Sequence, residues 1–296
     1  MKRRQRERAA FIVAFLAPAV LLYGWFVIWP VVQAVIFSGY RWRGVSIRRT
    51  YVGLDNFVRL KEDPVFWASA KNSIWLLVVA GAVMIALAVA VAHALRLRGR
   101  TAKVLRAIVL FPQMVSMVVV AVLWQFILNP QGLLNAGLRS VGLRGLARTW
   151  LGDSAWALPS VAVAFIWAAL GFYVLLFAAG LGAIPAEVNE AAELDGSSGW
   201  HRFWAVTWPL LWSVKRVATV YLVINVMNLF ALVFLMTRGG PDRRSEVMLT
   251  YLYEQAFVNS QFGYATAVAV GNFTVIMALT LVVLFLFRRN PVEGRA

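Results

Sequence analysis

Six long runs of this sequence contain no Asp, Glu, Lys or Arg. They cover residues 11–37, 73–92, 107–128, 155–183, 217–236 and 263–287. An α-helix needs about 20 residues to cross about 30 Å of hydrocarbon, and each run is near or above that length. Because a backbone in lipid must satisfy its own hydrogen bonds, such runs form helices. We therefore expect an all-α, polytopic membrane protein with six transmembrane helices.

The composition excludes an ordinary water-soluble domain. Of the 296 residues, 61% are hydrophobic and only 14% are charged, whereas soluble domains carry about a quarter charged residues. A net charge of +16 suggests nucleic acid in a soluble protein, but here the basic residues lie outside the apolar runs. We expect a membrane lipid environment and no nucleic acid.

With no Cys and only His93 and His201, the usual metal-ligand clusters are absent from the sequence, and we expect no metal site.

The charge pattern predicts one membrane domain between two short tails. The basic start of the chain resembles a signal peptide, but its apolar run continues to Phe37, which favours an uncleaved first span. Basic residues crowd the brief segment 93–106, and the positive-inside rule places that segment and both termini in the cytoplasm. The predicted parts are a basic tail 1–10; a transmembrane domain 11–288 with spans at about 11–37, 73–95, 107–128, 155–183, 215–236 and 263–287; a loop 184–214 within that domain; and a tail 289–296.

The loop 184–214 is the most patterned segment outside the apolar runs. Glu187, Glu190 and Glu193 recur every three residues on helix-forming sequence, which predicts a helix with one acidic face. Gly196 then permits a sharp break, and the two serines after it can cap a second short helix.

That second helix carries an aromatic stripe. Trp200, Phe203, Trp204 and Trp208 stand at i, i+3, i+4 and i+8, and Pro209 is expected to end the helix. One interpretation is a helix that inserts into a groove on another protein. The other is an interfacial helix whose rings lie among lipid headgroups, and the residues alone favour this second interpretation.

Several stretches resemble a known family. The residues Glu190-Ala191-Ala192, Gly196, Val206 and Trp208-Pro209 resemble the EAA loop of permease subunits of binding-protein-dependent ATP-binding-cassette (ABC) importers, with Val and Trp where that family prefers Ile and Leu. Residues 51–57, 132–135, 237–241 and 251–257 resemble its carbohydrate branch, the maltose/glycerol-phosphate type. The resemblance runs from about residue 11 to 288.

The resemblance implies a transport subunit rather than an enzyme, in a bacterial or archaeal cytoplasmic membrane. It implies as partners a second permease subunit that is a different chain, two ATPase subunits and an extracytoplasmic solute-binding protein. It implies no cofactor in this chain, with ATP-Mg bound by the ATPase subunits. The residues that it assigns to ATPase coupling are Glu190, Ala191, Ala192, Asp195, Gly196, Trp200, Phe203, Trp204 and Pro209. With the resemblance, the helix from about Ser198 to Trp208 becomes the expected docking element.

The missing ATP site agrees with this interpretation. A phosphate-binding loop needs Gly directly before Lys, and none of the five lysines follows a glycine. If ATP drives transport, its hydrolysis must occur in another chain.

The apolar runs offer neutral polar groups for a substrate. Their lack of ionisable residues counts against an ion-coupled secondary carrier or channel, the main alternative function. Tyr221, Asn225 and Asn228 fall at i, i+4 and i+7 on one helix face, and amides and a phenol suit sugar hydroxyls. Hydrogen bonding between packed helices is an equal alternative. Further candidates are Gln113, Ser116 and Asn272.

Two other possibilities are weaker. Glycerol phosphate is the alternative substrate, but an anion needs a cation along its path and no span supplies one, so we expect a neutral sugar or oligosaccharide. A membrane-embedded hydrolase is suggested by Ser197 and Ser198 near His201. A Ser–His pair needs a dry, preorganised site, and this stretch lies in a polar loop.

Overall fold

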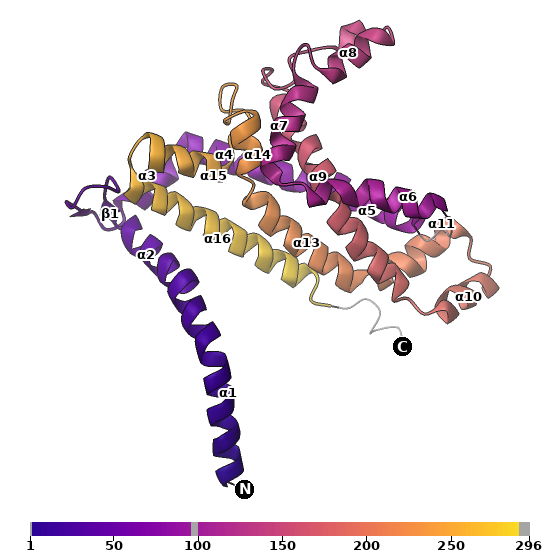
Figure 1. Ribbon diagram of the computed structural model, residues 1–296, viewed down its shortest axis with the longest axis horizontal. Coiled ribbons are helices and arrows are strands. Elements are labelled where there is room, and N and C mark those ends of the chain that lie inside the picture. Colours follow the sequence, from indigo (N-terminus) through magenta and orange to yellow (C-terminus); the bar gives the residue numbers. More distant parts are fainter. Residues whose placement is uncertain (1, 96–99, 290–296) are drawn as a thin grey trace. The chain divides into compact units, whose positions relative to one another are not determined.

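The computed structural model describes residues 2–95 and 100–289 (Figure 1). The chain divides into two compact units. The first unit combines residues 1–63 with 252–271. The second combines residues 64–251 with 272–296. The last long helix, α16 (Phe262–Leu286), starts in the first unit and ends in the second.

The first unit consists of an exposed helical span followed by a small hairpin. Its elements are α1 (Lys2–Tyr23), a π-helical turn (Gly24–Ile28), α2 (Trp29–Ser38), β1 (Tyr40–Arg41), β2 (Thr50–Tyr51), α3 (Asp55–Glu62), a second π-helical turn (Glu254–Val258) and the start of α16. The strands pair antiparallel, with Tyr40 opposite Tyr51. The buried amide of Asn56 donates to the carbonyls of Ser38 (2.8 Å) and Tyr40 (3.0 Å), which fixes the hairpin against α3.

The second unit holds most of the helices. Its elements are α4 (Pro64–Trp75), a π-helical turn (Leu76–Ala80), α5 (Gly81–Ala94), α6 (Arg100–Leu110), a 3₁₀ turn (Phe111–Met114), α7 (Met117–Leu128), α8 (Leu133–Ser140), a 3₁₀ turn (Arg144–Leu146), α9 (Ala157–Gly182), α10 (Ala186–Leu194), α11 (Gly199–Arg202), a π-helical turn (Phe203–Thr207), α12 (Trp208–Leu210), α13 (Trp212–Met227), α14 (Ala231–Met236), α15 (Met248–Tyr253) and the end of α16.

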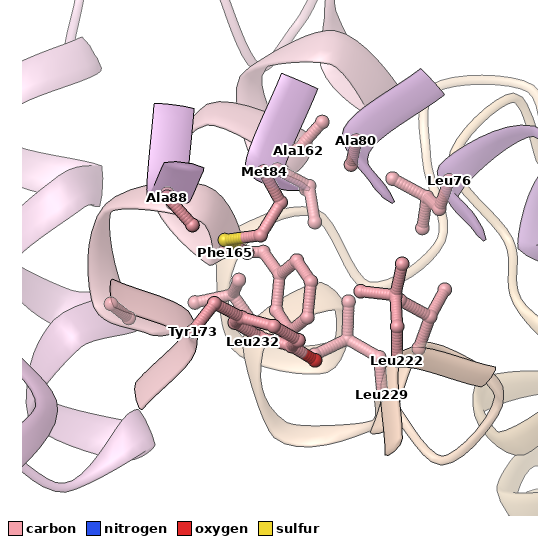
Figure 2. Packing of buried hydrophobic residues seen from close by; sticks show 14 of the residues in the cluster. Leu76, Ala80, Met84, Ala88, Ala162, Phe165, Tyr173, Leu222, Leu229 and Leu232 are labelled. Carbon is pink, nitrogen blue, oxygen red and sulfur yellow. The ribbon is translucent and has the colours of Figure 1, made fainter. Parts of the chain in front are cut away.

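Helices α5 and α9 form the centre of the second unit. Met84 of α5 and Phe165 and Tyr173 of α9 belong to its buried cluster, together with Leu222 of α13 (Figure 2). Lipid is as apolar as these side chains, so helices in a membrane associate through close packing rather than through the hydrophobic effect. Gly171 of α9 shows how close the packing is: a Cβ there would lie 2.8 Å from the carbonyl oxygen of Val109.

The predicted all-α, polytopic fold is confirmed, with only two two-residue strands among the described residues. Within residues 2–95 and 100–289, five helical spans are long and apolar enough to cross a membrane: Phe11–Ser38, Pro64–Ala94, Met117–Ser140, Ala157–Gly182 and Phe262–Leu286. A bent pair, Gly199–Leu210 with Trp212–Met227, makes a sixth if it counts as one span.

Two of the predicted spans are interrupted, the first of them at Pro112. Residues 107–128 are interrupted by the 3₁₀ turn and by the extended residue Val115. Residues 215–236 are interrupted at residues 228–230, between α13 and α14.

Candidate functional site

The loop between α9 and α13 begins with a helix that ends in a glycine cap. Helix α10 starts after Pro185 and carries Glu187 in its first turn, where a carboxylate stabilises the positive end of the helix dipole. At its other end, Gly196 has φ +75°. The Gly196 N–H donates to the Glu193 carbonyl and the Ser197 N–H donates to the Ala192 carbonyl, both at 3.0 Å. These two bonds are the Schellman motif, and the left-handed residue in it favours glycine.

The face of α10 that carries the EAA residues is largely exposed. Glu190, Ala191 and Asp195 are exposed, whereas Ala192 is buried. Leu194, at the end of the helix, is 89% exposed although its side chain is apolar. Exposed apolar groups rimmed by charges are typical of protein contact surfaces. The tip of α10 therefore has the character of a contact surface.

An ion pair joins α10 to the next helix. The Arg202 guanidinium donates to the Glu193 carboxylate, and both side chains are partly exposed. This contact spans the Gly196 turn, so α10 and α11 are linked both by backbone hydrogen bonds and by opposite charges.

The aromatic stripe is continuous, but its two ends differ. Rings contact along it from Trp200 to Trp204 (5.8 Å between centroids) and from Trp204 to Trp208 (5.6 Å). Phe203 fills the space beside them, 5.1 Å from Trp204 and 6.1 Å from Trp208. Trp200 is 75% exposed, whereas Phe203 and Trp208 are half-buried and pack against the core of the second unit.

One side of the stripe faces α5 across an apolar groove. The groove has a volume of about 810 Å³. Its walls are one face of α5, including Ala82, Ala86 and Ala90, and the aromatic rings of the loop. Because the alanine side chains of α5 are small, a groove remains between this helix and the indole rings of the loop. The stripe is therefore partly directed inward, toward α5.

The loop joins α13 through a sharp bend. Helix α12 continues one residue beyond Pro209 to Leu210, and the axis then turns by 69° at the buried Leu211. The Lys215 ammonium lies 4.2 Å from the centre of the Trp208 ring, a cation–π contact across the bend. These contacts connect the loop mechanically to the span that follows it.

The polar face predicted on α13 exists, but its hydrogen bonds are local. The Asn225 amide donates to the Tyr221 carbonyl (2.9 Å) and the Asn228 amide donates to the Ile224 carbonyl (2.8 Å). These bonds run within the helix, so they do not supply the interhelical links that the packing alternative needs. Tyr221 instead contacts α9 through its ring, 4.3 Å from Phe172.

The other three candidates lie in different settings. Gln113 is exposed in the 3₁₀ turn, and its amide oxygen lies 3.0 Å from the Cβ position of Gly171. Ser116 is the N-cap of α7 and accepts a hydrogen bond from the Val119 N–H (3.4 Å), which is a structural role. Asn272 of α16 is buried, and among the described residues its amide oxygen has no hydrogen-bond partner.

Sequence reasoning missed the aromatic residues of α9 that lie beside Tyr221. Tyr173 is buried, its ring centroid lies 6.1 Å from that of Tyr221, and its hydroxyl has no hydrogen-bond partner in the described part of the chain. A buried phenol hydroxyl usually finds a partner. Because Tyr173 lies inside a charge-free run, its sequence context is that of an ordinary core residue. Its contact with Tyr221 distinguishes it from the other buried residues of α9.

The comparisons with known proteins agree on one family. Residues 82–290 match the model of the family described as "Binding-protein-dependent transport system inner membrane component". The chain is 34% identical to the diacetylchitobiose uptake system permease protein NgcF of Streptomyces coelicolor, over 93% of this chain and 80% of that protein. It is 33% identical to the sn-glycerol-3-phosphate transport system permease protein UgpA of Brucella abortus, over 90% of each chain.

A solved structure shows the same fold. The chain superposes with a TM-score of 0.83 on a chain from a bacterial ABC transporter involved in the import of the acidic polysaccharide alginate. The match covers 97% of this chain and 98% of that one at 22% sequence identity.

Proposed function

The chain belongs to the family of inner membrane components of binding-protein-dependent transport systems, and on that premise we propose that it translocates a sugar or oligosaccharide as the permease subunit of an ABC importer. Transport proceeds by alternating access, in which the path opens first to the outside and then to the cytoplasm. Separate ATPase subunits supply the energy, and this chain performs no hydrolysis itself.

The observation that carries the proposal is the exposed part of the loop between α9 and α13. Leu194 and Trp200 expose 89% and 75% of their surface on either side of the Gly196 turn, next to the exposed Glu190. A chain without a phosphate-binding loop needs such a surface if a separate ATPase is to move it. The contact surface proposed here is the end of α10 together with Trp200, and the rest of the stripe anchors it.

The bend at Leu211 connects this contact surface to α13, the helix that carries the candidate substrate-binding residues. Phe203 and Trp208 pack against the core, and Lys215 of α13 contacts Trp208. A displacement of α10 and α11 therefore acts on the start of α13, whose other turns carry Tyr221 and Asn225. Packed elements with two discrete arrangements transmit such movements better than flexible ones.

The polar groups of the path favour a neutral, hydroxyl-rich substrate. The two amides of α13 use their N–H groups within the helix and keep carbonyl oxygens that can accept from hydroxyls. The rings of Tyr221 and Phe172 lie next to them and can stack on a sugar. Glycerol phosphate is the second candidate, because the chain is 33% identical to a glycerol-3-phosphate permease.

We propose the assembly that this function requires. It contains a second permease subunit, a different chain, two ATPase subunits that bind ATP-Mg, and an extracytoplasmic solute-binding protein. The chain spans the membrane six times with both termini in the cytoplasm, which places the α10–α12 loop on the side of the ATPase.

Cross-linking tests the contact directly, because the chain has no native cysteine. Leu194→Cys should cross-link to the ATPase subunit in the assembled transporter. The yield of the cross-linked product should change when ATP is added. Leu133→Cys is the matched control, since Leu133 is also a highly exposed leucine, 74% exposed, but lies on α8. Labelling of the Leu194 variant by lipid alone, with no ATPase adduct, would contradict the proposal and indicate that the loop lies among the lipid headgroups.

A further inference from the structure

The first unit contains a basic cavity that the transport path does not use. It lies beside the β1–β2 hairpin and α3, next to the turn at residues 259–261 that precedes α16, and its volume is about 890 Å³. The residues that line it include four arginines, Arg41, Arg43, Arg48 and Arg59, and one acidic residue, Asp55. Guanidinium groups recognise carboxylates and phosphates in a fixed planar geometry, so the cavity suits an anionic group.

Aromatic rings hold two arginines of this region in place. The Arg59 guanidinium lies 4.1 Å from the centre of the Tyr264 ring and donates to the Gln261 side-chain oxygen at 2.6 Å. Arg49, beside the cavity, lies over the rings of both Phe37 (4.9 Å) and Trp42 (4.7 Å). Because these side chains are already ordered, they lose less conformational entropy when a partner binds than mobile arginines would.

The backbone around the cavity is also rigid. The Trp42 indole donates to the Ser46 carbonyl (2.8 Å), and the Gly263 N–H donates to the Trp42 carbonyl (3.1 Å). The approach of α16 is so close that a Cβ on Gly263 would collide with the Tyr40 carbonyl oxygen, at 1.8 Å. The hairpin is therefore a fixed platform and not a loose loop.

The tip of the hairpin adds two apolar side chains to this basic surface. Val45 is 94% exposed and Ile47 is 99% exposed, and Arg43 and Arg48 flank them in the sequence. A small anion would need only the guanidinium groups. Exposed apolar residues bordered by fixed charges instead match the composition of a protein interface, with an apolar centre and a polar rim.

We propose that the cavity and the hairpin tip form a docking surface for the solute-binding protein, which inserts a carboxylate-bearing segment between the arginines. This inference rests on the proposed function, in which residues 38–63 face the extracytoplasmic side. Charge complementarity mainly raises the association rate and is weakened by salt, while the contacts of Val45 and Ile47 with the partner are insensitive to salt.

The test uses the complete transporter in nanodiscs of neutral lipid. The probe is the purified solute-binding protein that stimulates ATP hydrolysis by the wild-type complex. Its Kd is measured in NaCl solutions from low to high ionic strength, over which the Debye length falls by a factor of about two. In the double variant Arg43→Glu/Arg48→Glu we expect Kd to rise about tenfold at low salt and to depend less on salt. In the double variant Val45→Ser/Ile47→Ser we expect a rise of about threefold with the salt dependence of the wild type.

The matched control is Arg139→Glu/Arg144→Glu, which reverses two exposed arginines of the α8 region. Normal Kd values in the control support the cavity as the docking surface. An equal loss in the control, or an unchanged Kd in the hairpin variants, overturns the inference. If no binding protein stimulates the wild-type complex, the proposed function fails first and the inference fails with it.

Discussion

The two halves of the loop between α9 and α13 are held by different forces. Helix α10 is polar and mostly exposed, and it is fixed by the glycine cap at Gly196 and by the Glu193–Arg202 ion pair. The segment from Phe203 to Trp208 is aromatic and is fixed by packing against the core. Backbone geometry and surface charge thus orient the first half, while buried contacts secure the second.

This difference assigns separate tasks to the two halves. A surface that a partner must reach has to remain exposed, and a joint that transmits force has to be packed on both sides. The end of α10 with Trp200 meets the first requirement, and Trp208 with Lys215 meets the second. Single substitutions should therefore separate contact from transmission.

The largest expected effect is on the packed half. Trp208→Ala removes a half-buried indole from the core and its cation–π contact with Lys215, and we expect the free energy of unfolding to fall by about 2 kcal/mol. Thermal unfolding of the assembled transporter in detergent measures the loss. Trp200→Ala is the control: because Trp200 is 75% exposed, its removal should leave the melting temperature almost unchanged while it lowers the ATPase response. Equal destabilisation by both variants contradicts the division of the stripe.

The second effect concerns the turn between the halves. Gly196→Val places a β-branched residue at φ +75°, which costs roughly 1–2 kcal/mol and reorients α10 relative to α11. If this cost falls on the state in which α10 contacts the ATPase, the population of that state falls about tenfold, since about 1.4 kcal/mol corresponds to a factor of ten. We therefore expect the uptake per ATP hydrolysed to fall, with normal assembly. Gly199→Ala is the control, because Gly199 lies in α11 and an added Cβ has no atom within 4 Å. Normal coupling in the Gly196 variant would count strongly against the loop as the coupling element.

A smaller effect is expected on the path to which the loop connects. In Asn225→Ala and Asn228→Ala, loss of one sugar hydrogen bond of about 1 kcal/mol should raise the apparent KM for uptake about fivefold without changing assembly. Thr219→Val is the control, because it removes a hydroxyl that also bonds within α13, to the Lys215 carbonyl at 2.8 Å. If the control and the asparagine variants behave alike, the amides serve the helix and not the substrate.

The sequence predicted the elements of this molecule better than their contacts. Charge-free runs predict helices because lipid leaves the backbone no other partner, and the break at Gly196 follows from the conformational freedom of glycine. The period of the aromatic stripe predicts one face, but it cannot show that Trp208 packs against the buried core while Trp200 stays 75% exposed, because that depends on residues far away in the sequence. The interruption after Met227 has no signal in a run without Gly, Pro or charge.

The smallest expected effect tests the charge that joins the two halves. Glu193 and Arg202 are 63% and 27% exposed, and exposed ion pairs typically contribute about 0.2–1 kcal/mol. Glu193→Gln should therefore lower the melting temperature only slightly, and the difference from wild type should disappear in 1 M salt, where the Debye length is about 3 Å. Glu190→Gln, which changes another exposed carboxylate of the same helix, is the control for general charge effects. A large loss at low salt in the Glu193 variant, abolished by 1 M salt, would show that the ion pair, and not the glycine cap, orients α10, and the two halves would then depend on each other more than their separate contacts indicate.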